Sequence, residues 1–504
     1  MSHTSPVGEP RVRTVLWPIV RRALRQPRSI AVVDDQRTWR YVDLLGGALH
    51  VAKYIQAASD NPHVGVLLPT GGAFPMTMLA TWMLGRTLVP INYLLSASER
   101  QYITKHAGLD LVVTAGPMLD FLGDEPQGVT LMKLDELSFK GIPPLRLPAV
   151  ASADDLAAIL YTSGTSGKPK GVMLTHENLR SNIEASAEHI ELTRADCFLG
   201  VLPQFHSFGL TALTILPLAV GSKIVYTARF IPKQIVDLFR KHKPDIFMGI
   251  PQMYSALLTA KDAGPDDFKS LRLAVSGGGP LPMATFDKFR ERFDVAIHEG
   301  YGLTETSPVV SMNQLNQHRI GSVGRLIPGC SACVIDDHGK KLPAGEEGEI
   351  ALAGPNIMKG YYKQPELTAE VIRDDGYFIT GDWGKLDEDG YLYITGRKKE
   401  MLIIGGENVF PREIEEVLDR HETVAASAVI GREDPVRGEL PIAYVEMVED
   451  ATFDEGALRA YCRQHLAGFK VPREILLIDK LPRNPTGKIL RRELIAMTEG
   501  STNE

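Results

Sequence analysis

The sequence predicts an α/β protein with more than one domain, and three observations support this class. Short apolar runs alternate with helix-like segments through most of the chain, which is typical of largely parallel sheets covered by helices. After about Gly321 the runs are instead separated by Gly and Asp-Gly turns, which favours an antiparallel, barrel-like subdomain. The length of 504 residues also exceeds what one hydrophobic core normally supports.

The expected elements follow in chain order. Buried strands are predicted at 64–68, 111–114, 155–161, 198–202, 223–227, 246–250 and 271–276. Hairpin turns are predicted at 334–339 and 387–391, where Asp and Gly end a strand-like run. Around Gly396 a Lys/Arg-rich turn begins, and the chain then alternates helices and strands over about one small domain's length. We therefore expect one domain at 1–396 and a second at 397–504.

Composition and charge exclude several classes of protein. The net charge of −7 and the absence of a basic block argue against a nucleic-acid binder. Four cysteines in this length indicate a reducing compartment and no disulfide framework. No signal peptide is visible, and the longest apolar stretch, 210–220, is too short to span a bilayer. We expect a cytoplasmic protein; peripheral membrane contact and a homodimer are left open.

The most informative segment is YTSGTSGKPKGVMLTH, residues 161–176. Its glycines permit backbone N–H groups to turn toward one anion, and its hydroxyl groups and two lysines add donors and positive charge. An apolar run precedes it, and the residues from Thr175 are typical of a capped helix start. The pattern predicts a strand, a phosphate-binding loop and a helix in that order.

Two other interpretations of this segment are weaker. A Walker motif needs a glycine five residues before the Gly-Lys pair and a hydroxyl residue after it, but Gly167-Lys168 has Thr162 and Pro169 at those places. A solvated linker would not usually lie between an apolar strand and an amphipathic helix. The segment is therefore predicted to be a nucleotide loop of another kind.

Further segments of the sequence contain residues that suit nucleotide binding. SGGGPL at 276–281 follows a predicted strand and lets the backbone approach a flat base. HEGYGLTET at 298–306 offers Tyr301 for stacking and Glu305 as a magnesium ligand. TGD at 380–382 places Asp382 in a predicted tight turn, suited to the hydroxyls of a ribose. GRKKE at 396–400 and PRNPTGKI at 482–489 complete the set.

In this order the motifs resemble the adenylate-forming superfamily of acyl-CoA synthetases, luciferases and peptide-synthetase adenylation domains, over about residues 38–493. The resemblance implies a large AMP-binding N-terminal domain, made of two α/β subdomains and a barrel-like subdomain, and a small mobile α+β C-terminal domain. It also implies a hinge at Lys399, where a rotation would replace Lys488 with the strip Gly405-Gly406 that completes a tunnel for the thiol.

The same resemblance implies the roles of the site residues. The β- and γ-phosphates of ATP would be held by Thr162, Ser163, Gly164, Thr165, Ser166, Gly167 and Lys168. Adenine would lie between Tyr301, with Gly302 beside it, and the strip Gly277, Gly278 and Gly279. Thr304 would contact the α-phosphate, Glu305 would bind Mg²⁺, and Asp382 and Arg397 would hold the ribose. Lys488 would reach the carboxylate and the α-phosphate.

The segment LPQFHSFGL at 202–210 resembles the family's acyl site, with His206 and Phe208 as candidate acyl-binding residues. No charged residue lies in it, and no Asp is found where amino-acid-activating members carry one. Two interpretations of His206 are about equally good: a histidine packed in the core, or a side chain that gates the acyl site. Cys330 and Cys333 have the spacing of a metal pair, but no second pair accompanies them, so coincidence is the better interpretation.

The resemblance thus implies an acid–thiol ligase that uses ATP, Mg²⁺ and CoA. The expected reaction activates a medium- or long-chain fatty acid to an acyl-adenylate and transfers it to CoA, giving acyl-CoA, AMP and pyrophosphate. The GGENVFPREIE run at 405–415 looks more like CoA ligases than like acyl-acyl carrier protein synthetases, which are the main alternative. A ligase for an aryl or short-chain acid is the other. An inactive homologue would predict a broken motif, and each motif is intact.

Overall fold

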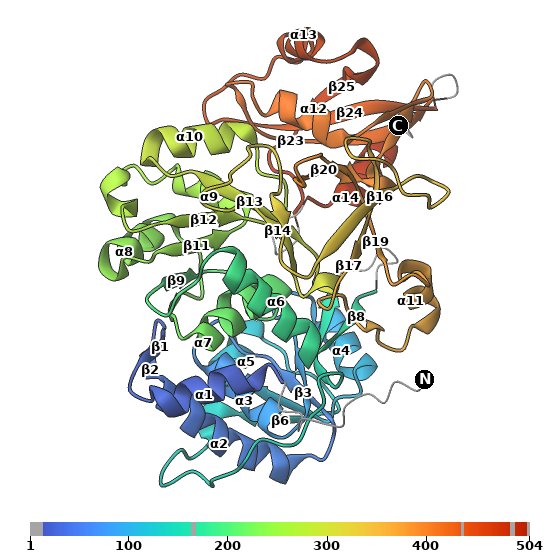
Figure 1. The fold of residues 1–504 in the computed structure, drawn as a ribbon. Helices are drawn as coiled ribbons and strands as arrows, with labels where there is room; N and C mark the ends of the chain where they lie inside the picture. The colour runs from blue at the N-terminus through green and yellow to red at the C-terminus, as the bar shows by residue number, and fades with distance from the viewer. Residues whose placement is uncertain (1–13, 163–167, 435–437, 484–488, 501–504) are drawn as a thin grey trace.

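The computed structural model describes residues 14–162, 168–434, 438–483 and 489–500. Within these residues the strands form four sheets; in Figure 1 the first lies at the bottom, the second and third lie side by side above it, and the fourth lies at the top. The predicted α/β class, with a large N-terminal part and a small C-terminal part, is confirmed.

The first sheet has seven strands in the order β18-β8-β7-β4-β3-β5-β6. They are β3 (His63–Val66), β4 (Thr87–Pro90), β5 (Leu111–Thr114), β6 (Thr130–Lys133), β7 (Leu156–Thr162), β8 (Lys170–Thr175) and β18 (Gly360–Tyr361). Strands β3 to β7 are parallel where they pair, whereas β8 is antiparallel to both β7 and β18.

One sequence prediction is corrected here. The glycine-rich segment connects β7 to β8 as a hairpin, so a strand lies between the loop and the helix that we expected directly after it. Residues 170–175 are KGVMLT, a three-residue apolar run without the alternation of a half-buried strand, so the strand is not recognised from the sequence alone. The helix itself begins as predicted, because the Thr175 hydroxyl accepts a hydrogen bond from the Asn178 N–H at 3.1 Å.

The second sheet has nine strands in the order β15-β14-β13-β12-β11-β9-β10-β1-β2. They are β1 (Ile30–Val33), β2 (Thr38–Arg40), β9 (Cys197–Gly200), β10 (Lys223–Tyr226), β11 (Ile246–Gly249), β12 (Leu273–Ser276), β13 (Ile297–Gly302), β14 (Val309–Met312) and β15 (Arg325–Leu326). Strands β9, β11 and β12 are buried at every position, as expected for parallel strands covered on both faces.

The third sheet is antiparallel and contains β16 (Ser331–Ile335), β17 (Gly348–Ala353), β19 (Phe378–Leu386) and β20 (Leu392–Arg397). Gly339 and Gly390 adopt φ of 75° and 81° in the turns predicted at these places. The prediction for Thr380-Gly381-Asp382 is wrong in one respect: these residues lie inside β19, where Gly381 has a φ of 71°. The ladder places Asp382 opposite Arg397 of β20.

The fourth sheet forms the small C-terminal part. It contains β21 (Leu402–Ile404), β22 (Glu407–Val409), β23 (Val424–Asp434), β24 (Gly438–Met447) and β25 (Glu474–Leu477). Its core is a separate cluster of buried side chains, including Ile414, Val429 and Val445. The predicted boundary at 396/397 falls within the last two residues of β20, just before the fourth sheet begins at Leu402, and stays a prediction.

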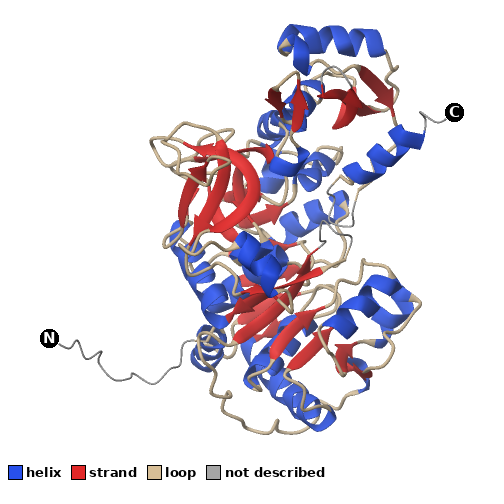
Figure 2. Ribbon diagram, turned by 90° about the vertical axis from the view of Figure 1, so that its right-hand side faces the viewer, coloured by secondary structure: helices blue, strands red, loops and turns tan. Residues whose placement is uncertain are grey.

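Helices pack on both sides of the two large sheets (Figure 2). The α-helices are α1 (Leu16–Arg25), α2 (Tyr41–Ala58), α3 (Ala73–Met83), α4 (Ala97–His106), α5 (Gly116–Leu122), α6 (His176–His189), α7 (Leu216–Val220), α8 (Pro232–His242), α9 (Pro251–Leu257), α10 (Met283–Phe293), α11 (Pro365–Val371), α12 (Pro411–Leu418), α13 (Glu455–His465) and α14 (Arg491–Gly500). A π-helix, η2 (Phe208–Ile215), and the 3₁₀ turns η1 (Leu134–Glu136), η3 (Pro265–Phe268), η4 (Thr304–Thr306), η5 (Lys398–Glu400) and η6 (Gly468–Lys470) complete the set. Among the described helices, none has the length and apolarity needed to cross a membrane.

Candidate active site

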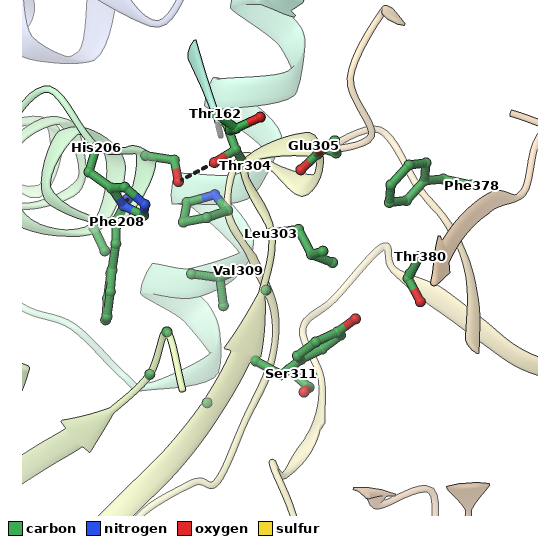
Figure 3. A pocket seen from close by; sticks show the side chains of 18 of the residues that line it. Thr162, His206, Phe208, Leu303, Thr304, Glu305, Val309, Ser311, Phe378 and Thr380 are labelled. Carbon is green, nitrogen blue, oxygen red and sulfur yellow. Dashed lines mark hydrogen bonds between the residues drawn. The ribbon is translucent and has the colours of Figure 1, made fainter. Parts of the chain in front are cut away.

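A cavity of about 680 Å³ opens where the two large sheets meet the antiparallel sheet. This volume is within the usual range of small-molecule sites. Figure 3 shows His206 and Phe208 on one side of it, Phe378 and Thr380 on the other, and Leu303 and Thr304 between them. The cavity therefore has two halves that meet at Thr304.

One half is polar. Its wall includes Thr162 at the end of β7, Lys170 at the start of β8, Tyr301, Thr380 and Arg397. These residues come from three different sheets, so the packing of the sheets against one another brings them together. Hydroxyl, guanidinium and ammonium groups of this kind suit a phosphorylated nucleoside.

Asp382 lies behind this wall and is 3% exposed. Its Oδ1 lies 2.7 Å from Arg397 Nε, and its Oδ2 accepts a hydrogen bond from Tyr301 Oη at 2.5 Å. Burial, and then the Asp382 carboxylate, raise the pKa of Tyr301 well above its usual value, so the phenol donates this bond. Burial alone would lower the pKa of Arg397, but the neighbouring carboxylates, Asp382 first, raise it. Asp382 thus holds Tyr301 and Arg397 in place on the polar half.

Glu305 is the carboxylate of this half, and it is half-buried at the cavity wall. Tyr361 Oη donates to Glu305 Oε1 at 2.9 Å, and the described residues offer it no ion-pair partner. A hard cation such as Mg²⁺ prefers carboxylate oxygens and typically takes its other ligands from phosphates and water. A carboxylate that faces a polar cavity and forms no direct ion pair among the described residues fits such a cation, and no cluster of three metal-binding side chains occurs in the described chain.

The other half is largely apolar. Phe208 begins η2, and the wall continues through Ile190, Ala212, Leu216, Met248, Val275, Val309 and Met312. Each of these side chains is uncharged, and the charged residues of the wall all lie on β8, η4, β17, β20 and η5. This half therefore suits an uncharged, apolar ligand group.

His206 lines the cavity beside the apolar half and is exposed, so it is not a packed core histidine. The protein atoms that enclose the cavity lower the pKa of His206, and the ring is neutral at pH 7. The next residue, Ser207, is buried, and its Oγ lies 3.1 Å from Thr304 Oγ1. This contact joins the segment of the apolar half to the 3₁₀ turn of the polar half.

Two of the three predicted glycines of the strip after β12 line the cavity. A Cβ on Gly277 would lie 3.1 Å from the Phe208 ring, so the glycine permits that ring to lie against the strand end. Gly278 has a φ of 79°, which favours glycine. Gly279 does not line the cavity wall.

The cavity brings together eleven of the sequence-predicted site residues: Thr162, His206, Phe208, Gly277, Gly278, Tyr301, Gly302, Thr304, Glu305, Arg397 and Lys399. Lys168 is exposed outside the wall, and Gly405 and Gly406 form the turn between β21 and β22. Ser163, Gly164, Thr165, Ser166, Gly167 and Lys488 lie outside the described residues.

The structure adds residues that sequence reasoning missed as site residues, namely Lys170, Glu349, Tyr361 and Lys398. Lys170 could have been included from its place beside the glycine-rich loop. Glu349 and Tyr361 belong to no motif, because only the strand pairing brings β17 and β18 to the cavity.

Comparisons with known proteins agree with this geometry. The family model described as AMP-binding enzyme matches residues 19–362, and the one described as AMP-binding enzyme C-terminal domain matches 413–488. A long-chain-fatty-acid–CoA ligase of Bacillus subtilis (strain 168) is 32% identical, with 94% of this chain and 92% of that protein covered. A sulfoacetate–CoA ligase of Cupriavidus necator is 38% identical, with 86% and 87% covered. The solved O-succinylbenzoate coenzyme A synthetase of Bacillus subtilis, in complex with ATP and magnesium ion, has a TM-score of 0.84 at 30% identity, with 95% and 99% covered.

Proposed function

Because the chain belongs to the AMP-binding enzyme family, we propose that it joins a carboxylic acid to the thiol of CoA in two steps that consume ATP. The protein is an AMP-forming acid–thiol ligase whose cofactors are ATP, Mg²⁺ and CoA. The observation that carries the proposal is the contact between Ser207 and Thr304. It places the apolar half directly against the polar half, so an acid and a nucleotide in the same cavity would meet at Thr304.

The main requirement of the first step is to offset the repulsion between two anions, and not to remove a proton with a base. A carboxylic acid has a pKa of about 4.3 and is already ionised at neutral pH, so it can attack the α-phosphorus without losing a proton. The difficulty is the repulsion between two anions, and fixed cationic and hydroxyl donors offset it in the transition state. We assign this role to Thr304 and to Lys488, which lies outside the described residues. Mg²⁺ bound at Glu305 would neutralise phosphate charge.

The second step needs a thiolate. A thiol with a pKa of about 8.5 is a few per cent ionised at pH 7, so a dedicated base is unnecessary. We propose that the small C-terminal part rotates about Lys399 between the two steps. The rotation would bring Gly405 and Gly406 toward the cavity, and as glycines they place no side chain in the path of a thiol-bearing arm; their φ values of 62° and 91° also favour glycine.

For the acid, we propose a medium- or long-chain fatty acid. The apolar half supports this class, because every residue that we place in it is uncharged. An acid such as sulfoacetate carries a second anion, which this half offers no cation to meet. An aryl acid without a second anion is the alternative that the apolar wall also suits.

The test is pyrophosphate release with a panel of acids at equal concentration: acetate, octanoate, palmitate, benzoate and sulfoacetate. We expect octanoate or palmitate to give the highest kcat/KM and to depend on ATP and Mg²⁺. A preference for benzoate or sulfoacetate would overturn the fatty-acid proposal and leave the ligase assignment in place. No release with any acid would count against the ligase assignment itself.

The acceptor is tested with the preferred acid. We expect AMP formation to depend on free CoA, with saturation between about 1 μM and 1 mM, the usual range of KM. Turnover with holo-acyl carrier protein and not with CoA would instead identify an acyl-acyl carrier protein synthetase.

A further inference from the structure

Tyr361 lies at the wall of the polar half and connects the strand β8 to the helix α11. It is the second residue of the two-residue strand β18, where it pairs with Val172 of β8. Its own N–H donates to Thr368 Oγ1 of α11 at 2.9 Å, and its side chain is 7% exposed. The Tyr361 backbone is therefore anchored to the strand that leaves the glycine-rich hairpin, and its side chain is held in a packed environment.

The segment of Tyr361 holds Glu305 at two points. Tyr361 Oη donates to Glu305 Oε1 at 2.9 Å, and the Met358 N–H donates to the Glu305 carbonyl oxygen at 2.8 Å. A phenol has an ordinary pKa of about 10, so the Tyr361 hydroxyl keeps its proton at physiological pH and donates this bond. The phenol is thus a permanent donor that orients Glu305 and occupies one of its two oxygens.

The chemistry of this donor matters. A lysine or arginine in the same place would also orient the carboxylate, but its positive charge would cancel the charge that a divalent cation needs. A phenol fixes the orientation and leaves the full negative charge on Glu305. The ammonium of Lys170 lies over the Tyr361 ring, 5.3 Å from its centroid, and forms no ion pair with Glu305 among the described contacts.

Resting on the proposed function, we propose that Tyr361 is a positioning residue for the magnesium site. Its hydroxyl orients Glu305 so that the second carboxylate oxygen, Oε2, meets the cation that accompanies ATP. Because β18 pairs with β8, the same residue keeps Glu305 in register with the hairpin that carries the glycine-rich loop. Outer partners of metal ligands typically change metal affinity by about 10- to 100-fold when they are removed.

The variant Tyr361→Phe removes one hydroxyl and keeps the ring. We expect its affinity for Mn²⁺, measured by electron paramagnetic resonance in the presence of a non-hydrolysable ATP analogue, to fall by about 10-fold or more. The magnesium concentration that half-saturates pyrophosphate release should rise by a similar factor. The KM for the acid should stay within about twofold, because the apolar half is unchanged.

The neighbouring residue supplies a matched control. Tyr362 carries the same phenol and packs its ring against His63 and His106, but its hydroxyl has no hydrogen-bond partner among the described residues. Tyr362→Phe should leave both metal measurements unchanged. Thermal unfolding of both variants, which we expect within about 2 °C of the wild type, checks that each is folded.

Three outcomes would overturn the proposal: an unchanged Mn²⁺ affinity in Tyr361→Phe, an equal loss in Tyr362→Phe, or a loss of acid affinity as large as the loss of metal affinity. The Mn²⁺ measurement requires no turnover. It therefore distinguishes failure of this proposal from failure of the proposed function, in which the wild type would bind the metal and nucleotide but release no pyrophosphate with any acid.

Discussion

At the scale of single residues, the ionisation of Glu299 makes the free energy of unfolding depend on pH. It lies in β13, and burial raises its pKa to about 7 from an ordinary value of 4.5, while the nearby Arg412 lowers it. Between these two pH values the folded chain holds a proton that the unfolded chain has released. The free energy of unfolding therefore falls as pH rises through this window, and the full cost is present above about pH 7.

Glu299→Gln removes this cost, because the amide is neutral at every pH. We expect the variant to unfold at higher urea than the wild type at pH 8, with a gain of about 1–3 kcal/mol, and at nearly the same urea at pH 5. Glu291→Gln, an exposed change in α10, serves as the control and should have no pH-dependent effect. A gain of equal size at pH 5 and pH 8 would show that ionisation of Glu299 is not the cause.

Single residues were predictable where a motif carries them. Tyr301, Thr304 and Arg397 reach the cavity wall as the motifs indicate. The ladder and hydrogen bonds add what no motif states, namely that Asp382 lies behind the wall and bonds both Tyr301 and Arg397. Tyr361 escaped prediction because its partner Glu305 is distant in sequence and the contact depends on the pairing of β18 with β8.

At the scale of elements, the passage from β13 into η4 depends on Gly302. An added Cβ would lie 1.9 Å from the carbonyl oxygen of Pro308, far inside van der Waals contact with backbone that cannot rotate away. In Gly302→Ala the turn must therefore shift, and Thr304 and Glu305 shift with it. We expect adenylation, measured as pyrophosphate release, to fall by at least about 100-fold, since a misplacement of 1 Å in a catalytic group can cost that much.

Gly46→Ala is the control for Gly302→Ala. Nothing lies within 4 Å of an added Cβ at Gly46, which is in the helix α2, so this change should keep activity and raise stability by about 0.5–1 kcal/mol. Wild-type activity in Gly302→Ala would mean that η4 tolerates displacement and that Thr304 and Glu305 need no fixed position.

Strands with a continuous apolar run could be predicted from the sequence, whereas two segments that contain glycines were assigned wrongly from their turn residues. Buried parallel strands such as β9 and β11 are apolar throughout, so their sequences identify them. The strand β8 was missed because it directly follows a glycine-rich loop, where the sequence also suits a helix start. The Thr380-Gly381-Asp382 motif was assigned to a turn because of its glycine, whereas the pairing of β19 with β20 keeps it in a strand.

At the scale of the whole molecule, the ion pairs around Lys399 bear on the proposed rotation of the C-terminal part relative to the antiparallel sheet. Lys398 Nζ lies 2.9 Å from Glu349 Oε2, on β17, and 3.0 Å from Asp337 Oδ1. On the other side of Lys399, Glu400 lies 3.2 Å from Arg491 Nε of α14 in the C-terminal part. One neighbour of Lys399 is tied to the antiparallel sheet and the other to the C-terminal part, so a rotation between them would have to be absorbed at Lys399.

The sequence could suggest this junction only through the family resemblance. The composition change at Gly396 marks a boundary, but it does not say which residue would act as a hinge. The ion pairs on either side favour Lys399 as the hinge residue. No local sequence pattern indicates these ion pairs, because they join residues that are distant in sequence.

Lys399→Pro tests the rotation directly, because proline restricts φ to about −65° and removes the backbone donor. We expect the thioester step to fall by at least about 10-fold while adenylation stays within a few-fold of the wild type, since only the second step requires the rotation. Single-turnover assays with CoA present should then show the acyl-adenylate accumulating. Lys399→Ala removes the side chain and keeps the backbone free, so it should retain both steps. If Lys399→Pro slows both steps in parallel, or if Lys399→Ala loses the thioester step to the same extent, Lys399 acts through its side chain or through folding, and the rotation must be absorbed elsewhere.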